Sequence, residues 1–326
     1  MALDVHLRRP AGAGQTDGRI ADTPVRSRSL FVTGATGFIG RYLLAALERE
    51  GFDKVTWLTR RPNPRPNAPA GWTMLSGDLA DPATYQAALA GCDAVVHLAA
   101  ATGSASDRDL QLVNVEATRW LLDSCERQGV GRILFVSSIA ADYPDLSRYP
   151  YGRSKLAAET LVRQSPLDYT ILRPTIVLGR ESPIWQKLRG LAMLPVMPVF
   201  GDGSARVQPI SVEDVAHAMV YLLDHSRFSN EVLELGGPDV LTMLGLLRRI
   251  RKACGKSEGL ALRIPARPVQ FALGVLGKVA GGRLPVSPGQ LVPFISDGVA
   301  DPSDLATVLR PTMIPLDDLL GQLAAA

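Results

Sequence analysis

The chain has 326 residues, of which 46% are hydrophobic and 21% charged, and its formal net charge is +3. This balance is typical of a globular protein of one or two domains, and we expect no nucleic-acid partner. The cluster Arg248, Arg249, Arg251 and Lys252 suits a solvated helix face better than a nucleic-acid patch. The three cysteines form no CxxC pair and the four histidines no ligand spacing. We therefore predict no disulfide framework and no metal site, in a reducing compartment.

The first 28 residues are rich in Ala, Gly, Pro and Arg and contain no apolar run like that of a secretory signal. We expect them to be a flexible tail. No run of eighteen apolar residues occurs, so no membrane-spanning helix is expected. These observations favour a cytoplasmic protein.

Residues 29–41, SLFVTGATGFIGR, predict a strand, a glycine turn and the start of a helix. Gly34, Gly37 and Gly40 would let the backbone approach a ligand, because a Cβ would block that approach. Such a turn places backbone N–H groups and a helix N-terminus against a pyrophosphate. A glycine triplet alone is also compatible with a tight turn that binds nothing.

The pattern of residues 54–59, KVTWLT, predicts a second strand, and Arg60 and Arg61 follow it directly. In dinucleotide-binding folds the residue after this strand meets the adenosine ribose. An acid there binds the free 2′-OH, whereas an arginine accommodates a 2′-phosphate. The two arginines therefore predict NADP(H). The alternative is a pair of solvated arginines before the Pro-rich residues 62–69.

Strands and helices then alternate up to about residue 175. Strands are expected at residues 72–75, 94–100, 132–138 and 168–174. A helix is expected from Asp81-Pro82, another at residues 114–128 and a third within residues 149–161. This alternation predicts an α/β fold with a doubly wound parallel sheet. His97, inside an apolar strand, is expected to be a packed histidine rather than a catalyst.

Beyond residue 175 the pattern loosens, although residues 212–224 and 241–254 predict helices and residues 230–237 a strand. We expect residues 29–180 to form the cofactor domain, with residues 206–237 returning to it. Residues 181–205 and 238–326 would form a smaller, mostly helical substrate domain.

Ser138, Tyr151 and Lys155 form the group best suited to chemistry. Tyr151 and Lys155 are four residues apart on a predicted helix and share one face. We expect the Lys155 ammonium to lower the pKa of the Tyr151 phenol toward working pH. Such a tyrosine can exchange a proton with a carbonyl or alcohol oxygen while a nicotinamide exchanges a hydride. A hydroxyl from Ser138, at a strand end, would hold the same oxygen. A chance pairing of an exposed Tyr and Lys with a buried Ser is the alternative.

Six segments in order resemble an extended or atypical short-chain dehydrogenase/reductase, of the NAD-dependent epimerase/dehydratase family: TGATGFIG, GDL, HLAA, FVSS, YGRSK and LRPT. The resemblance implies a Rossmann domain, with Asn114 joining Ser138, Tyr151 and Lys155 as a structural or proton-relay residue. It also implies the cofactor-binding residues Gly34, Thr36, Gly37, Phe38, Ile39, Gly40, Arg60, Arg61, Asp78, Leu79, Ala99, Ala100, Tyr151, Lys155, Pro174 and Thr175.

Residues 200–216, FGDGSARVQPISVEDVA, are similar to the subgroup that contains the dehydrogenase-like accessory subunit of respiratory complex I. Members of that subgroup often hold NADPH without turning it over. A non-catalytic NADPH-binding subunit or assembly factor is therefore one hypothesis, although the filled Ser, Tyr and Lys positions favour catalysis.

Residues 188–200 and 268–279 are apolar and suit a hydrophobic substrate pocket, a peripheral membrane contact at the inner membrane surface, or ordinary core packing. We expect an NADP(H)-dependent ketoreductase for a hydrophobic substrate, of which a 3-oxo-ceramide-type lipid is one resemblance-based example. A nucleotide-sugar epimerase or dehydratase is the alternative enzyme. A homodimer is common in the family, but the sequence leaves the oligomeric state open.

Overall fold

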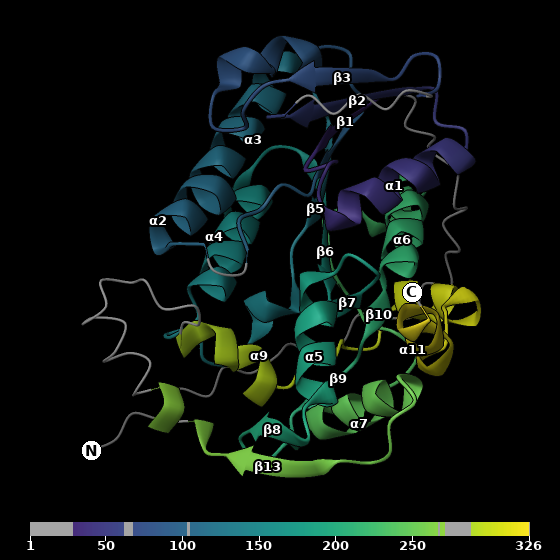
Figure 1. Ribbon diagram of the computed structural model, residues 1–326. Helices are drawn as coiled ribbons and strands as arrows, with labels where there is room; N and C mark the ends of the chain where they lie inside the picture. The colour runs from purple at the N-terminus through teal and green to yellow at the C-terminus, as the bar shows by residue number, and fades with distance from the viewer. Residues whose placement is uncertain (1–28, 62–67, 103–104, 267, 271–287, 326) are drawn as a thin grey trace, which may run out of the picture.

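The computed structural model describes residues 29–61, 68–102, 105–266, 268–270 and 288–325. A seven-stranded parallel sheet runs through the upper part of the molecule in the order β11-β6-β5-β4-β1-β2-β3 (Figure 1). This is the doubly wound order, in which the strand sequence reverses between β1 and β4. Its strands are β1 (Ser29–Thr33), β2 (Lys54–Thr59), β3 (Thr73–Ser76), β4 (Ala94–His97), β5 (Arg132–Val136), β6 (Asp168–Pro174) and β11 (Glu231–Leu235).

Helices cover both faces of the sheet. One face is covered by α1 (Phe38–Arg49) and α6 (Val212–Asp224), which contact each other. The other face is covered by α3 (Ala117–Gln128) and α4 (Pro150–Gln164), with the single turn α2 (Asp107–Leu110) and the π-helical turn η3 (Gln111–Glu116) leading into α3. The α/β fold with a doubly wound parallel sheet is confirmed.

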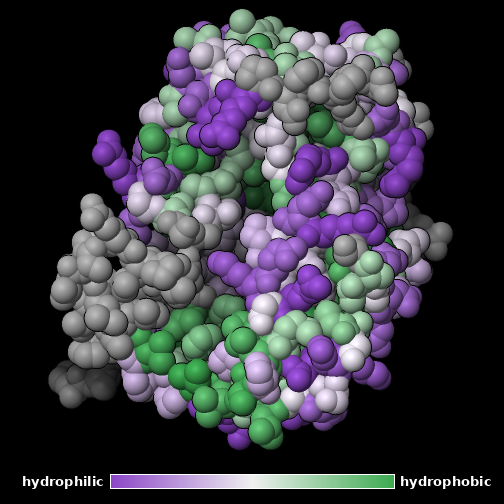
Figure 2. Space-filling view, viewed as in Figure 1, coloured by the Kyte–Doolittle hydropathy of each residue, from purple (hydrophilic) through white to green (hydrophobic). Residues whose placement is uncertain are grey.

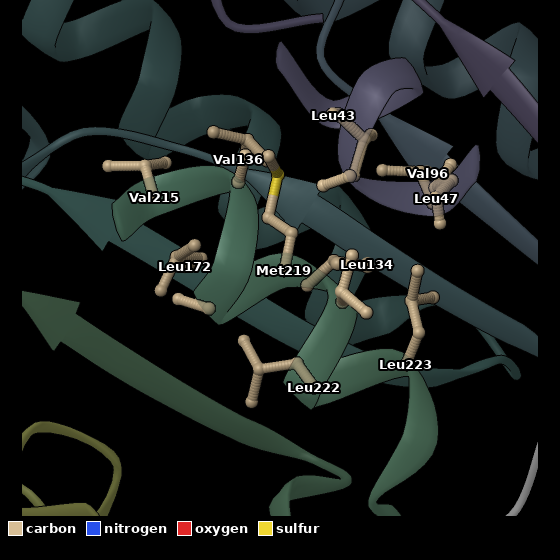
Figure 3. Close-up of a cluster of buried hydrophobic side chains, with 14 of the residues drawn as sticks. Leu43, Leu47, Val96, Leu134, Val136, Leu172, Val215, Met219, Leu222 and Leu223 are labelled. Carbon is tan, nitrogen blue, oxygen red and sulfur yellow. The ribbon is translucent and has the colours of Figure 1, made fainter. Parts of the chain in front are cut away.

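The core under α1 and α6 follows from helical periodicity. Leu43 and Leu47 of α1, and Met219 and Leu223 of α6, each recur after four residues and so share one helix face. Figure 3 shows these side chains meeting Val96, Leu134, Val136 and Leu172 of the central strands. The short 3₁₀ turns of the chain are η1 (Pro82–Thr84), η2 (Gln86–Leu89), η4 (Ile139–Asp142), η5 (Ser226–Phe228), η6 (Pro288–Leu291) and η7 (Arg310–Thr312).

The helix expected from Asp81-Pro82 is wrong, because the chain forms only the turns η1 and η2 there. The Asp81 carboxylate caps the Ala83 N–H at 3.2 Å, as a helix start requires. Tyr85 then leaves the helical region, with φ −137°, and ends the first turn. The helix expected at residues 114–128 begins earlier and includes the π-helical turn η3, which contains Asn114.

Part of the chain beyond β6 builds a second packed region below the sheet in Figure 1. Its helices are α5 (Pro183–Met193), α7 (Met243–Ala253), α9 (Val292–Ile295) and α11 (Leu316–Ala324), whereas α10 (Asp304–Leu309) packs its Leu305 and Leu309 against the core of the large sheet. Three strand pairs complete the region: β7 (Val177–Leu178) with β10 (Ile210–Ser211), β9 (Arg206–Val207) with β12 (Leu241–Thr242), and β8 (Val196–Phe200) with β13 (Leu260–Ile264).

Some of the apolar residues 188–200 are buried, and others are exposed. Leu188, Ala192, Met197 and Val199 are buried in the lower core, so for these four the core-packing alternative is confirmed. Residues 1–28, and residues 271–279 of the second apolar segment, lie outside the described part of the chain. Within the described ranges, no helix is both long and apolar enough to cross a membrane.

Candidate active site

A cavity of about 250 Å³ opens at the carboxyl ends of β1, β2 and β4, beside the start of α1. This is the position where parallel sheets of this order bind ligands, since the strand order reverses there. Eight of the expected cofactor residues line it, together with eight that the sequence analysis did not single out. The first group is Gly34, Thr36, Gly37, Arg60, Asp78, Leu79, Ala99 and Ala100, and the second is Thr33, Leu58, Thr59, Gly77, Ala80, Leu98, Val113 and Ala117.

The glycines of the β1–α1 turn have different roles. Gly34 has φ +72°, and a Cβ there would lie 2.5 Å from the backbone nitrogen of Ala99. Gly40 is buried, and a Cβ there would lie 2.6 Å from the Ala35 Cα, so it permits α1 to pack on the turn. Gly37 precedes α1 with extended backbone and lines the cavity, where a Cβ would meet only the Gly34 carbonyl oxygen at 3.1 Å. The β1–α1 turn therefore fits a dinucleotide, because the open side of Gly37 lets phosphates approach the backbone there.

The different surroundings of Gly34 and Gly37 predict different effects of the variants Gly34→Ala and Gly37→Ala. Gly34→Ala should lower the free energy of unfolding by at least about 2 kcal/mol, because it combines a positive φ with a backbone clash. Gly37→Ala should leave stability nearly unchanged and weaken NADPH binding, because its Cβ occupies the open side of the turn. Urea unfolding and a fluorescence titration with NADPH check both variants. Equal loss of stability in the two would contradict these assigned roles.

Arg60 and Arg61 differ in position. Arg60 lines the cavity at the end of β2, where the Thr59 hydroxyl organises the turn. Thr59 Oγ1 donates to the Arg61 carbonyl at 2.8 Å and accepts from the Arg61 N–H at 3.3 Å. Arg61 is exposed and does not line the cavity. Of the two arginines, Arg60 is thus the one that lines the cavity.

Besides Arg61, Tyr151 and Lys155, five further expected cofactor residues lie outside the cavity lining. Ile39 packs against the core, Phe38 packs edge-to-face on Tyr42, and Gly40 is buried in α1. Pro174 ends β6, and the hydroxyl of the neighbouring Thr175 donates to the Gln208 carbonyl. The structure therefore groups the adenosine side of the expected site in one cavity and leaves these five in the surrounding packing.

His97 is fully buried and both of its ring nitrogens are hydrogen-bonded. Its Nε2 lies 2.9 Å from Thr118 Oγ1, whose proton goes to the Asn114 carbonyl, so His97 Nε2 donates. Its Nδ1 accepts from Thr33 Oγ1 at 2.7 Å. Burial lowers the pKa of His97 to about 3, which keeps the ring neutral. The expectation of a packed histidine is confirmed.

The Asn114 side chain connects two parts of the site. Its Oδ1 accepts from the Ala101 N–H at 2.7 Å, and its Nδ2 donates to the Ala101 carbonyl at 3.1 Å and to Ser154 Oγ at 2.9 Å. Ser154 precedes Lys155 on α4. Asn114 thus holds the loop after β4 against the helix that bears Tyr151 and Lys155, and its part in catalysis stays a prediction.

Ser138 and Tyr151 are brought together by a close approach of η4 and α4. A Cβ on Gly152 would lie 2.6 Å from the Ala140 carbonyl, so only glycine allows this approach beside Tyr151. Burial raises the pKa of Tyr151, and a hydrogen bond with the Ser138 side chain lowers it in part. Tyr151 packs against a small hydrophobic cluster made of Ile139, Ala140, Tyr143, Leu146, Tyr149 and Val292.

Lys155 is 2% exposed and is more deeply buried than Tyr151. Its Nζ donates to the Val136 carbonyl at 2.8 Å and lies 4.3 Å from the centre of the Phe135 ring. Burial lowers the pKa of Lys155 to about 7, and Glu159 partly restores it. The expectation that Lys155 lowers the pKa of Tyr151 is wrong for this arrangement. Burial of the phenol dominates, and the ammonium is bonded to Val136.

The depressed pKa of Lys155 predicts a pH dependence of stability. Between about pH 7 and the ordinary lysine pKa of 10.5, the unfolded chain binds a proton that the folded chain lacks. The contribution of this group to stability is therefore complete above pH 10.5 and is lost as the pH falls toward 7. Lys155→Met should remove this rise from the curve of unfolding free energy against pH. An unchanged slope between pH 7 and 10 would contradict the assignment.

Beneath Lys155, a buried ionic cluster joins α4 to the strands behind it. Glu159 and Arg173 are paired at 2.9 Å through both carboxylate oxygens, and Glu159 is fully buried. Ser137 Oγ donates to Glu159 at 2.6 Å, and Arg173 also pairs with Asp142 at 2.6 Å and Glu234 at 3.2 Å. Burial acts to lower the pKa of Arg173, and its bonds with Glu159 and Asp142 raise it overall. Sequence reasoning missed this cluster, although Glu159 follows Lys155 by one helical turn.

Residues 30–236 match the family described as the NAD dependent epimerase/dehydratase family, and the chain belongs to that family. It is 30% identical to a dTDP-glucose 4,6-dehydratase from Streptomyces niveus, covering 73% of this chain and 81% of that protein. It is 32% identical to a ceramide reductase from Caulobacter vibrioides, covering 58% and 59%, and 31% identical to a mitochondrial complex I subunit, alpha subcomplex subunit 9, from Arabidopsis thaliana, covering 65% and 54%.

Solved structures of extended short-chain dehydrogenases share the fold. MoeE5 in complex with UDP-glucuronic acid and NAD superposes with a TM-score of 0.68 at 22% identity, over 91% of this chain and 98% of that one. Through the family that residues 30–236 match, the chain belongs to a nicotinamide-dinucleotide-dependent class of oxidoreductases and epimerases. The family resemblance and its complex I-like relatives, expected from the sequence, are confirmed.

Proposed function

We propose that this chain is an NADP(H)-dependent reductase that converts a ketone on a hydrophobic, lipid-like substrate to an alcohol. The observation that carries the proposal is the placement of Ser138 beside Tyr151, with Lys155 one helical turn further along α4. Arg60 supports NADP(H) because it lines the dinucleotide cavity with a fixed positive charge. The apolar neighbours of Tyr151 support a hydrophobic substrate.

In this reaction the nicotinamide, when bound, would supply the hydride. Tyr151 would donate its hydroxyl proton to the carbonyl oxygen, since the phenol is in its protonated form at neutral pH. The Ser138 hydroxyl would hold the same oxygen and fix its position. Lys155, one helical turn further along α4, would help to hold the nicotinamide ribose, as the family resemblance implies.

The ceramide reductase similarity makes a 3-oxo-ceramide-type ketone the first substrate to try. A second candidate function is a nucleotide-sugar epimerase or dehydratase, which the similarity to a dTDP-glucose 4,6-dehydratase favours. A third is a non-catalytic NADPH-binding subunit or assembly factor, which the similarity to a complex I subunit favours. The complete set of Ser138, Tyr151 and Lys155 speaks for an enzyme, since a purely structural subunit needs none of them.

A substrate screen separates these functions. The purified protein is incubated with NADPH and a series of long-chain ketones, among them a 3-oxo ceramide, and NADPH oxidation is followed. In parallel it is incubated with NAD⁺ and UDP- or dTDP-sugars, and the products are separated. NADPH oxidation with a lipid ketone supports the proposal. Conversion of a sugar nucleotide without net NADPH use, or NADPH binding with no turnover of any substrate, contradicts it.

A further inference from the structure

The two strands β8 and β13 present an outer face that is apolar from end to end. Their register places Val196 beside Leu260, Pro198 beside Leu262 and Phe200 beside Ile264. Side chains alternate along a strand, and the intervening Met197 and Val199 are buried in the lower core. The six paired residues therefore share the opposite face of this small sheet, which we call the outer face. A sheet with one face on a core usually has polar residues on the other.

Much of the outer face is in contact with solvent. Leu260 is 75% exposed, Leu262 57% and Val196 44%, and Leu194, just before β8, is 44% exposed. At the opposite end Phe294 of α9 packs edge-to-face on Phe200, so α9 covers only that end. Figure 2 shows a hydrophobic area at the bottom of the molecule, where Figure 1 places β8 and β13. Burying such residues in a nonaqueous surface is favourable, because it removes apolar area from water.

Basic side chains gather at the exposed end of the outer face. The Arg251 guanidinium donates to the carbonyls of Ala192, Leu194 and Ser257. These hydrogen bonds join the end of α5 to the loop before β13. The Lys256 N–H donates to the Arg251 carbonyl at 3.1 Å, so Lys256 lies at the same end. Residues 248–263 contain six Lys or Arg and a single acid, Glu258. The cluster Arg248–Lys252, interpreted from the sequence as a solvated helix face, is part of this set, and within it Arg249 pairs with Asp239 and Asp317.

We propose that the outer face of β8 and β13 docks this protein on a membrane surface that contains anionic lipids. The exposed leucines and Val196 would enter the boundary between headgroups and acyl chains, and the basic residues would meet the lipid phosphates. A second copy of the chain suits this face less well, because it carries the same basic residues and a net charge of +3, whereas anionic lipids complement them. The inference uses no residue of the cofactor site and is independent of the proposed reaction.

Vesicle co-sedimentation of the full-length protein tests the proposal. The vesicles are phosphatidylcholine alone or phosphatidylcholine mixed with phosphatidylglycerol. Binding to the mixed vesicles is expected to fall at least about tenfold in Leu260→Ser/Leu262→Ser, because the buried apolar area is lost. Lys252→Glu/Lys256→Glu should weaken binding to the mixed vesicles only. The matched control Val240→Ser/Val308→Ser changes two exposed valines outside this sheet, 50% and 42% exposed, and should bind like wild type.

Two results overturn the proposal. One is no binding of wild type to the mixed vesicles, or binding that Leu260→Ser/Leu262→Ser leaves unchanged. The other is a concentration-dependent dimer in sedimentation velocity that the same variant abolishes, because a second copy then covers the face. Since the altered side chains are exposed, thermal unfolding should be close to that of wild type, and this measurement shows that a loss of binding is not a loss of folding.

Discussion

Tyr151→Phe should lower turnover by about 10²–10⁴-fold, because it removes the group that exchanges the proton with the substrate oxygen. The ring itself stays, and with it the packing between Ile139, Tyr149 and Val292. NADPH affinity should therefore change little, since the adenosine cavity lies at β1, β2 and β4. Steady-state rates with the ketone identified in the screen, and a fluorescence titration with NADPH, measure the two effects separately.

Tyr149→Phe is the matched control for this variant. The Tyr149 ring lies 5.8 Å from the Tyr151 ring and stacks on Tyr143. This variant therefore removes a phenol hydroxyl from nearly the same surroundings. Its rate should stay close to that of wild type, because Ser138 acts on the pKa of Tyr151 and not on that of Tyr149. Turnover that survives Tyr151→Phe, or that falls equally in Tyr149→Phe, would remove Tyr151 from the proton transfer.

Arg173→Met should lower the free energy of unfolding by about 3–5 kcal/mol, because it leaves the fully buried Glu159 carboxylate without its main partner. Asp142 and Glu234 lose the same partner at the edge of the cluster. The loss is large because an unpaired charge in the interior cannot regain its hydration. Urea unfolding at neutral pH, followed by circular dichroism, gives the value.

Arg163→Met provides the comparison, since Arg163 pairs with the same Glu159 carboxylate at 3.1 Å but is 37% exposed. Its loss should lower the unfolding free energy by less than about 1 kcal/mol, as for a partly solvated ion pair. If Arg173→Met were no more destabilising than Arg163→Met, the buried cluster would not be what holds α4 on the strands behind it.

The sequence predicted the sheet and the adenosine side of the site because both depend on local signals. Gly34, Gly37 and Arg60 are set by the residues directly around β1 and β2, and eight expected residues do line one cavity. The parallel, doubly wound character of the large sheet also follows from the regular alternation of strands and helices. The packed state of His97 followed from its place in an apolar strand.

The features that were missed depend on burial and on contacts distant in sequence. Helical spacing places Lys155 and Tyr151 on one face, but it does not show that Lys155 is 2% exposed and bonded to Val136. The partner of Glu159 is Arg173, fourteen residues away on a strand. Likewise, the apolar outer face requires the pairing of β8 with β13, which are separated by more than fifty residues. Their pairing is parallel, and no local sequence motif predicts it.

The most direct test of the dinucleotide assignment compares NADPH and NADH binding in wild type, Arg60→Ala and Arg61→Ala. We predict that wild type binds NADPH more tightly than NADH. Arg60→Ala should weaken NADPH binding by about 10–100-fold, the value of one or two charge-assisted hydrogen bonds, and leave NADH binding unchanged. Arg61→Ala should change neither, because Arg61 does not line the cavity. Equal affinity of wild type for the two cofactors, or an equal loss of both in Arg60→Ala, would contradict the assignment.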